Sequence, residues 1–316
     1  MKQFTSMSDV SDLNQLVESA VYFKKDPLVE PDLGKGKTLG LIFFNPSLRT
    51  RLSTQKAAQN LGLSCMVMNF VSEGWQLETE EGVIMSGEKA EHIVEAAGVI
   101  GQYCDILGIR AFATFTDQEK DYKEEVLNSF IKYSKIPVVS LESATLHPLQ
   151  SLADLVTIEE YKKKGKPKVV LSWAPHPRIL PQSVANSFAQ WMRQANVDLV
   201  ITHPPGYELN TKFTKGAKII YDQEKAFDQA NFIYVKNWSS YEPYGQLLSQ
   251  DPGWKITASK MGLTNNAYFM HCLPVRRNVI VDDEVLDGEA SLVIPQAANR
   301  VYAAQAVLKS LLTTNF

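Results

Sequence analysis

Short apolar runs alternate with longer amphipathic segments along most of the chain. In its first half the runs are typical of buried strands, and the segments between them have helical spacing. The predicted strands are 38–44, 64–70, 105–109 and 137–141, and the predicted helices are 49–60, 91–101 and 122–133. Strands that alternate with helices form parallel sheets covered by helices, so this half predicts a doubly wound α/β domain.

A second series of the same kind follows, and it predicts a second doubly wound domain. Its predicted strands are 168–172, 198–202, 219–221, 232–234 and 268–271. A helix is predicted at 150–162, between the two series, and a last helix at 296–312 that packs back onto the first domain. We therefore expect a first domain of residues 1–149 with 296–316, and a second domain of residues 150–295.

Composition narrows the class of protein. The chain has 316 residues, 45% apolar and 21% charged, which is typical of a globular protein of about two domains. Its net charge of −3 offers no basic field for nucleic acid, and its three cysteines form no metal-ligand cluster. No segment resembles a signal peptide or a membrane span, so we expect a cytoplasmic protein with no membrane partner.

Polar residues stand directly after several predicted strands, where the ligand crevice of a parallel sheet lies. The segment 47–51 (Ser-Leu-Arg-Thr-Arg) opens a helix after the first strand, so guanidinium groups and free helix amides meet at one point. Other polar residues after strands are Arg110, His147, Gln150, His176, His271, Cys272, Arg276 and Arg277. The pattern predicts a site for a phosphate-like dianion.

Each of these residues also has a purely structural interpretation. The alternatives are surface charges for Arg49 and Arg51, a turn cap for His147, a core residue for Cys272, a rigid turn for His176 and a solvated strand end for Lys236. Taken singly, the residues leave these alternatives open.

Three motifs occur together and in order. They are residues 47–51, residues 147–150 (His-Pro-Leu-Gln) followed by Ala153 and Asp154, and residues 271–274 (His-Cys-Leu-Pro). In these motifs the chain resembles the aspartate/ornithine carbamoyltransferase family. The resemblance implies two parallel α/β domains joined by interdomain helices, with the last helix returning to the first domain, and a homotrimer whose active sites are shared between subunits.

The resemblance also implies a chemistry. An uncharged amine attacks the carbonyl carbon of carbamoyl phosphate and phosphate departs, so the site must hold a dianion and stabilise an oxyanion, with no cofactor and no metal. The implied contacts with carbamoyl phosphate are Ser47, Leu48, Arg49 and Thr50 on the phosphate, Arg110, His147 and Thr50 on the carbonyl oxygen, Gln150 on the amide, Cys272 and the carbonyl of Leu273 at the reacting centre, Arg300, and Trp75 from a neighbouring subunit. The implied catalytic residues are Arg49, Thr50, Arg110, His147, Gln150 and Cys272.

One departure from the family pattern bears on the acceptor. Ornithine carbamoyltransferases carry an acid before a Ser-Met-Gly loop, and this acid pairs with the α-ammonium of ornithine. The aligned segment 233–240 has no Ser-Met-Gly and carries Lys236 in place of the acid. Because lysine repels an ammonium, the acceptor is expected to have an acylated α-nitrogen. The resemblance to the branch acting on N-acetylornithine and N-succinylornithine implies acceptor contacts with Glu142, His176, Lys236 and Arg276.

The two acyl groups differ by one carboxylate. Members of the branch that act on acetylornithine carry a glutamate at the position matching Ala90 and a carboxylated lysine at the position matching Ile280. A glutamate there would repel the distal carboxylate of a succinyl group, and Ala90 removes that repulsion. We therefore expect carbamoyl transfer to N-succinylornithine in arginine biosynthesis, with N-acetylornithine as the alternative acceptor.

Two other classes of function are compatible with a doubly wound α/β fold. A non-catalytic, metabolite-binding member of the fold would be expected to lose catalytic groups, but all six implied catalytic residues are present. A dinucleotide-binding dehydrogenase has the same doubly wound architecture. It requires a Gly-x-Gly-x-x-Gly turn after the first strand of a domain, and neither domain has one.

Overall fold

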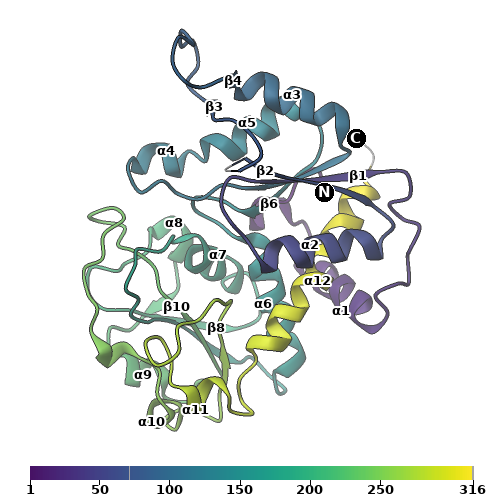
Figure 1. Cartoon of the computed structure of the whole chain (residues 1–316). Coiled ribbons are helices and arrows are strands. Elements are labelled where there is room, and N and C mark those ends of the chain that lie inside the picture. The colour runs from purple at the N-terminus through teal and green to yellow at the C-terminus, as the bar shows by residue number, and fades with distance from the viewer. Residues whose placement is uncertain (71, 315–316) are drawn as a thin grey trace. The chain divides into compact units, whose positions relative to one another are not determined.

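Parallel strands form two separate main sheets in this protein (Figure 1). The computed structural model describes residues 1–70 and 72–314. The chain divides into unit 1, which comprises Met1–Leu149 and the chain from Arg300 onward, and unit 2, which comprises Gln150–Asn299. Helices α6 (Pro148–Tyr161) and α12 (Val293–Leu312) carry the chain from one unit to the other. The predicted α/β class with parallel sheets is confirmed.

The sheet of unit 1 has four strands in the order β2-β1-β5-β6. Their bounds are β1 (Thr38–Phe43), β2 (Ser64–Asn69), β5 (Ile106–Arg110) and β6 (Val138–Glu142). The helices are η1 (Met7–Asp9), α1 (Leu13–Lys25), α2 (Arg49–Asn60), α3 (Ile93–Tyr103), α4 (Gln118–Tyr122) and α5 (Glu125–Ser134). Strand β1 is central and nearly all apolar, because side chains on both of its faces are buried.

Helices α3 and α5 pack against each other, and a glycine sets their separation. Gly101 lies in the last turn of α3, and a Cβ at this position would lie 2.2 Å from the carbonyl oxygen of Ser134 at the end of α5. Gly98, one turn earlier, has far more room, since a Cβ there would lie 4.0 Å from the carbonyl oxygen of Tyr133. Of these two glycines of α3, only Gly101 requires the absence of a side chain.

Several elements of unit 1 differ from the prediction. Helix α1 and the short parallel pair β3 (Leu77–Glu78) and β4 (Glu91–His92) were not predicted. The helix predicted at 91–101 begins at Ile93, because Nδ1 of His92 accepts a hydrogen bond from the backbone N–H of Val94 and caps it. The helix predicted at 122–133 is wrong in its first turn, because α4 and α5 are separated at Glu124.

Glu124 interrupts the chain in the left-handed conformation, with φ of 53°. Its buried carboxylate accepts hydrogen bonds from the Ser143 hydroxyl and from the backbone N–H groups of Ala144 and Thr145. Burial raises the pKa of the Glu124 carboxyl, against the lowering effect of these hydrogen bonds. The break between α4 and α5 is thereby fastened to the turn that leads from β6 to His147.

The sheet of unit 2 has five parallel strands in the order β11-β10-β7-β8-β9. Their bounds are β7 (Lys168–Trp173), β8 (Asp198–Thr202), β9 (Lys218–Ile219), β10 (Phe232–Lys236) and β11 (Tyr268–Met270). The further helices are α7 (Ser183–Met192), α8 (Thr211–Thr214), α9 (Gln223–Phe227), η2 (Pro252–Trp254), α10 (Ala258–Met261) and α11 (Asp283–Leu286). The strand predicted at 219–221 is therefore shorter and starts one residue earlier.

The core of unit 2 is built from the apolar strands and the helices that cover them. Trp173, Phe188, Tyr234 and Phe269 are fully buried, and the rings of Phe188 and Tyr234 stack with centroids 4.0 Å apart. Ile280 is also buried in this core. It occupies the position at which members acting on acetylornithine were expected to carry a carboxylated lysine. The carboxyl ends of the parallel strands thus stand on a rigid base.

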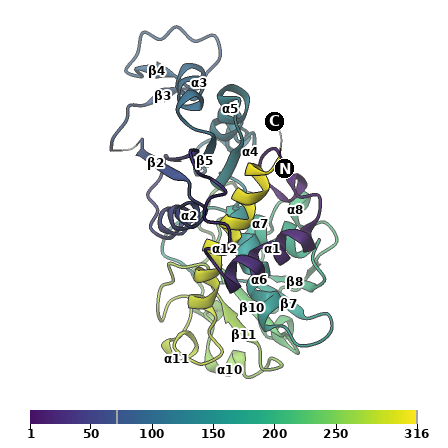
Figure 2. The same cartoon turned by 90° about the vertical axis from the view of Figure 1, so that its right-hand side faces the viewer.

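The last part of α12 lies beside α1 in unit 1, as Figures 1 and 2 both show. Nε2 of Gln305 donates to the backbone oxygen of Pro27, just after α1, and its Oε1 accepts from Asn60 at the end of α2. Lys309 forms an ion pair with Glu30. The C-terminal helix is therefore a structural part of unit 1.

Candidate functional site

Two buried guanidinium groups meet at the start of α2. Nη1 of Arg110 donates to Oγ1 of Thr50 over 3.3 Å, and Nη2 of Arg300 donates to the same oxygen over 2.5 Å. All three residues are buried. Two guanidinium cations that are shielded from solvent require negative charge nearby, so this point in unit 1 suits an anion.

The start of α2 adds backbone donors to these cations. Leu48 precedes the helix in a helical conformation, and its side chain makes no capping hydrogen bond. The start of α2 brings backbone N–H groups and the positive end of the helix dipole beside Thr50. Ser47 and Arg49, both half-buried, flank this point.

Glu142 and His147 extend the cluster on the other side of Arg110. The Glu142 carboxylate pairs with Nη1 of Arg110 over 2.8 Å and lies 3.6 Å from Nε2 of His147. The carboxylate and the imidazole are both buried. Glu142 was expected among the acceptor contacts, whereas its contacts in the structure are with Arg110 and His147, which were assigned to carbamoyl phosphate.

The third motif forms a tight turn after β11 in unit 2. Nδ1 of His271 accepts from the backbone N–H of Leu273, and Leu273 has the left-handed φ of 50°. A branched side chain rarely adopts this conformation, and such residues gather at functional sites. The turn holds the buried Cys272 between them.

Three residues assigned to the acceptor lie together in unit 2. Nε of Arg276 donates to Nε2 of His176 over 3.0 Å, and Nδ1 of His176 lies 2.9 Å from the backbone oxygen of Arg178. Burial lowers the pKa of His176, and the positive charges of Arg276, Lys236 and Arg178 lower it further. His176 is thus held neutral in a cationic cluster, which suits an acceptor with negative charge.

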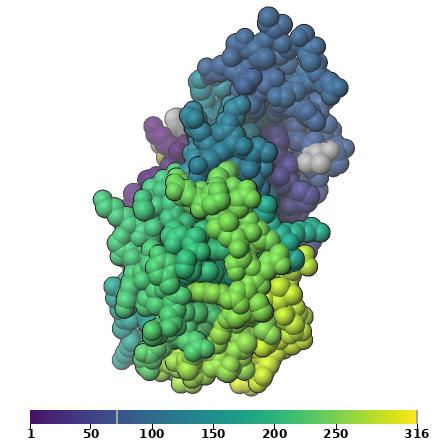
Figure 3. Space-filling model, turned by 90° about the vertical axis from the view of Figure 1, so that its left-hand side faces the viewer, coloured from purple at the N-terminus to yellow at the C-terminus, as the bar shows by residue number. Residues whose placement is uncertain are grey.

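Trp75 and Ala90 belong to a separate part of unit 1, the exposed segment around β3 and β4, whose blue atoms are seen in Figure 3. Nε1 of Trp75 donates to Glu91 over 2.9 Å, and 56% of the Trp75 side chain is exposed. The ion pairs Lys120–Glu80 and Lys132–Glu81 fasten the segment to α4 and α5. Neither Trp75 nor Ala90 joins the cluster around Thr50.

Apart from Trp75 and Ala90, the predicted site residues fall into three groups, and two further residues were missed. The first group, in unit 1, is Thr50, Arg110, Glu142, His147 and Arg300 with the helix start 47–49. The second group, in unit 2, is His176, Lys236 and Arg276. The third group, also in unit 2, is Gln150 in the first turn of α6, with Cys272 and Leu273. Asp154 and Gln296 are fully buried polar residues linked to Gln150. The only sequence signal for Asp154 was its place in the second motif.

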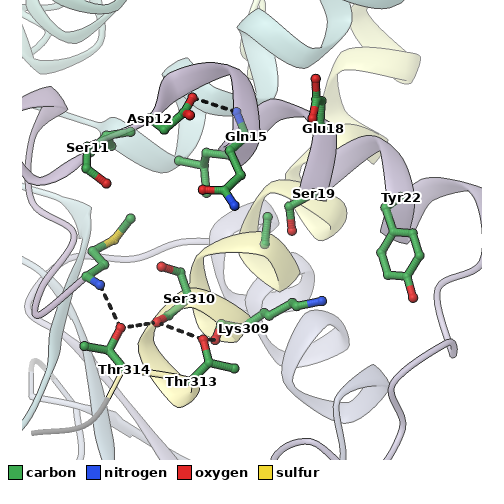
Figure 4. A pocket seen from close by; sticks show the side chains of 14 residues that line it. Ser11, Asp12, Gln15, Glu18, Ser19, Tyr22, Lys309, Ser310, Thr313 and Thr314 are labelled. Carbon is green, nitrogen blue, oxygen red and sulfur yellow. Dashed lines mark hydrogen bonds between the residues drawn. The ribbon is translucent and has the colours of Figure 1, made fainter.

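A pocket of about 510 Å³ lies elsewhere in unit 1, between α1 and the end of α12 (Figure 4). Asp12, Gln15, Tyr22 and Lys309 are among its lining residues, and Oδ1 of Asp12 accepts from the backbone N–H of Gln15. None of the predicted site residues is among the described residues that line it. In residues 1–70 and 72–314 no group of three His, Cys, Asp or Glu is arranged to hold a metal ion, and no helix is long and apolar enough to span a membrane.

Comparison with known families agrees with this geometry. Residues 2–160 match the model of the aspartate/ornithine carbamoyltransferase carbamoyl-P binding domain, and residues 181–311 match the Asp/Orn binding domain of the same family. The chain belongs to the aspartate/ornithine carbamoyltransferase family. The resemblance stated from the three motifs is confirmed.

Relatives and solved structures within this carbamoyltransferase family are similar over nearly the whole chain. An N-succinylornithine carbamoyltransferase of Bacteroides thetaiotaomicron is 57% identical over 314 residues, 99% of each chain. An N-acetylornithine carbamoyltransferase of Xylella fastidiosa is 36% identical over 335 residues, 98% of each chain. A crystal structure of an N-acetyl-L-ornithine transcarbamylase with one glutamate replaced by alanine, complexed with carbamyl phosphate and N-succinyl-L-norvaline, has a TM-score of 0.92 and 34% identity, and the match covers 98% of this chain and 100% of that chain.

Proposed function

We propose that this protein transfers the carbamoyl group of carbamoyl phosphate to the δ-amine of N-succinyl-L-ornithine, giving N-succinyl-L-citrulline and phosphate in arginine biosynthesis. The observation that carries the proposal is the convergence of Arg110 and Arg300 on Thr50 at the start of α2. Family membership and the 57% identical relative named N-succinylornithine carbamoyltransferase support it.

In the proposed reaction, the start of α2 holds the phosphate dianion. Ser47, Leu48 through its backbone, Arg49 and Thr50 contact the phosphate oxygens, and Arg300 adds a guanidinium. Arg110, His147 and Thr50 stabilise the negative charge that develops on the carbonyl oxygen when the amine attacks. The C–O bond to phosphate then breaks and the amine nitrogen gives its proton to the departing phosphate, which leaves as the hydrogen phosphate dianion that this cationic site accommodates.

The remaining assigned residues orient the reacting group. Gln150 accepts from the carbamoyl amide, and Cys272 with the carbonyl of Leu273 borders the reacting centre. Carbamoyl phosphate binds first, and the acceptor is then held by His176, Lys236, Arg276 and Glu142. No residue of this set requires a cofactor or a metal.

Charge supports a succinylated acceptor. Lys236 and Arg276, beside the neutral His176, form a cationic cluster, which favours an acceptor with an extra carboxylate over one with a free α-ammonium. Ala90, exposed in the segment around β4, brings no negative charge to repel that carboxylate. A solved relative with one glutamate replaced by alanine is complexed with N-succinyl-L-norvaline, in line with this argument.

Steady-state kinetics with the two acceptors tests the choice. We expect kcat/KM for N-succinyl-L-ornithine to exceed that for N-acetyl-L-ornithine by about a hundredfold, because the wrong acyl group leaves the cationic cluster unpaired. A preference for N-acetyl-L-ornithine would replace the proposed acceptor. Absence of turnover with both acceptors, together with binding of carbamoyl phosphate, would favour a non-catalytic, metabolite-binding role.

A homotrimer with shared sites is the proposed assembly. Strand β2 is an edge strand, and Met66 and Met68 on it are 54% and 38% exposed; Leu48 and Leu52 at the start of α2 are 65% and 59% exposed. Exposed apolar side chains of this size on neighbouring elements mark an interface between chains. The proposed trimer brings Trp75 of one subunit to the site of another.

Sedimentation velocity tests the assembly. We expect a species of about three times 35.4 kDa, and a smaller species when Met66 and Met68 are both replaced by lysine. The control is Val99→Lys, which changes a 46% exposed apolar residue on α3 and should leave the size unchanged. A monomer of full activity would contradict the shared site. The cytoplasmic location expected from the sequence stays a prediction.

A further inference from the structure

Asp154 is the centre of a buried hydrogen-bond network in unit 2. It lies one turn after Gln150 in α6, and its side chain is fully buried. Oδ1 of Asp154 accepts from Nε2 of Gln150 over 2.7 Å and from Nε2 of Gln296, in α12, also over 2.7 Å. Two carboxamides thus direct their NH₂ groups at one carboxylate oxygen.

This contact decides which end of the Gln150 carboxamide is presented to a ligand. The carboxamide oxygen accepts hydrogen bonds and its nitrogen donates them, but the two atoms are nearly equal in size. The hydrogen-bond partners of Gln150 therefore determine which of the two orientations is adopted. Oδ1 of a carboxylate accepts hydrogen bonds, and it therefore selects the NH₂ end of Gln150. The Oε1 end is then the part of Gln150 that meets the ligand.

The same carboxylate sets the polarity of the third motif. Because Gln296 directs its NH₂ at Asp154, its Oε1 is turned to the backbone N–H of His271, from which it accepts over 3.0 Å. The next residues are Cys272 and Leu273, which were assigned to the reacting centre. Asp154 therefore contacts Gln150 directly and is linked to the start of the third motif through Gln296.

Tyr234 closes the network from β10. Its hydroxyl is fully buried beside the Asp154 carboxylate and the Cys272 sulfur, and its ring stacks on Phe188 of α7. Burial, and then the neighbouring Asp154 carboxylate, raise the pKa of Tyr234 well above its usual value. The phenol stays protonated and can donate to this cluster.

We propose that Asp154 is a positioning residue that makes the site selective for a donor with an amide NH₂, through its hold on the Gln150 carboxamide. This inference rests on the proposed function. It predicts discrimination between carbamoyl phosphate and acetyl phosphate, which has a methyl group in place of the NH₂. An acceptor oxygen that faces a methyl group loses its hydrogen bond, and such a site rejects the analogue.

The test is Asp154→Asn, which keeps the size of the side chain but also offers a donor. The Gln150 carboxamide is then free to turn over and to present its NH₂ group to the ligand. We expect the dissociation constant of carbamoyl phosphate, measured by equilibrium binding, to rise by about tenfold or more. The dissociation constant of acetyl phosphate should change by less than about threefold, because its methyl group makes no hydrogen bond to Gln150 that the variant could lose. Thermal unfolding verifies that the variant is folded.

The matched control is Ser151→Ala on the same helix. Oγ of Ser151 donates to Oγ of Ser187 over 2.8 Å, and the side chain is as deeply buried as that of Gln150. The variant loses a buried hydrogen bond without changing the polarity of Gln150, so the ratio of the two dissociation constants should stay within about twofold. A loss of the ratio in both variants would show a merely structural role and would overturn the inference.

A double variant tests the route of the effect. In Gln150→Met the ratio should fall to the value seen in Asp154→Asn, and adding Asp154→Asn should not lower it further. Independent, multiplying effects would overturn the inference. If Asp154→Asn does not fold, Asp154→Ser provides the same test, since a hydroxyl also donates as well as accepts.

The outcomes also separate this inference from the proposed function. Binding of the two phosphates is measured without an acceptor, so it does not depend on turnover. A wild type that discriminates carbamoyl phosphate from acetyl phosphate but turns over neither acylated ornithine would refute the proposed function alone. Equal weakening of both phosphates by Asp154→Asn in an active enzyme would refute this inference alone.

Discussion

Arg300 and Thr50 are 250 positions apart in the sequence, and Nη2 of Arg300 donates to Oγ1 of Thr50 over 2.5 Å. The contact joins α12 to the first turn of α2 within unit 1. Since Arg110 donates to the same oxygen, one hydroxyl fixes the direction of two cations. Loss of the Thr50 hydroxyl alone is therefore expected to disturb both arginines of the site.

Replacing Thr50 by valine tests this relationship. The substitution keeps the shape of the side chain but removes the hydroxyl, so both guanidiniums lose a fixed partner. We expect kcat/KM for carbamoyl phosphate to fall by about a hundredfold, as for the loss of one oxyanion-stabilising group. The control is Thr54→Val, one turn later on the same helix and equally buried, which should retain activity within about threefold. Equal losses in the two variants would contradict a specific role.

Replacing Ala90 by glutamate tests the origin of acceptor selectivity. A carboxylate about 4 Å from the succinyl carboxylate costs about 1–4 kcal/mol, or about tenfold to several hundredfold. We therefore expect the ratio of kcat/KM for N-succinyl-L-ornithine to that for N-acetyl-L-ornithine to fall by at least about tenfold. Ala90→Gln adds the same bulk without charge, so it separates repulsion from crowding. A ratio that falls equally in both variants would exclude the electrostatic explanation.

The buried His203, which follows β8, is expected to make the folded protein less stable in acid. Its side chain is fully buried, with Nδ1 donating to the backbone oxygen of Pro204, and burial lowers its pKa from 6.5. At a pH between the pKa of His203 in the unfolded chain and its lowered pKa in the folded chain, the unfolded chain binds a proton that the folded chain does not. The free energy of unfolding therefore falls as the pH falls through this range. The loss per pH unit is at most about 1.4 kcal/mol for one group.

The measurement is the midpoint of thermal unfolding from pH 8 to pH 5 for wild type and His203→Gln. We expect the wild-type midpoint to drop more steeply below pH 6.5, because glutamine has no proton to take up. His92→Gln is a suitable control, since His92 is half-buried and caps α3 at the surface. Parallel curves for wild type and His203→Gln would show that His203 does not carry the effect.

Two glycines of α3 provide a matched pair for stability. A methyl group at Gly101 would lie 2.2 Å from the backbone of α5, so Gly101→Ala must push the two helices apart. We expect a loss of about 1–3 kcal/mol in the free energy of unfolding. Gly98→Ala has room and raises helix propensity, so a gain of about 0.5–1 kcal/mol is expected. Chemical denaturation measures both, and similar values would contradict the packing of α3 on α5.

The fold was largely predictable because buried parallel strands appear as continuous apolar runs. Strands β1, β7, β8 and β10 all lie within about two residues of the predicted ranges. The pair β3–β4 was missed because such short strands depend on their partners more than on their own pattern. Helix α1 was missed although its sequence carries a signal, an Asp12 N-cap followed by apolar residues at helical spacing. The break at Glu124 has no local signal, since its cause is the turn at 143–145.

The candidate site was predictable by position but not by contact. The motifs named Thr50, Arg110 and Arg300, yet no pattern in the sequence indicates that two arginines share one hydroxyl. The partner of Arg110 was also unforeseen, since Glu142 was assigned to the acceptor. Such contacts arise from the register of parallel strands, which places Arg110 of β5 beside Glu142 of β6.

The buried carboxylate of Glu124 also matters for anyone who wishes to redesign this protein. It shapes the turn before His147 from about twenty positions earlier in the chain. A library that varies residues 143–145 alone would keep the backbone N–H donors of Ala144 and Thr145 but would mostly lose the hydroxyl donor of Ser143, so the Glu124 carboxylate would be left with fewer partners. The two segments form one mutational unit, and productive variants are expected only where residue 124 and the turn change together.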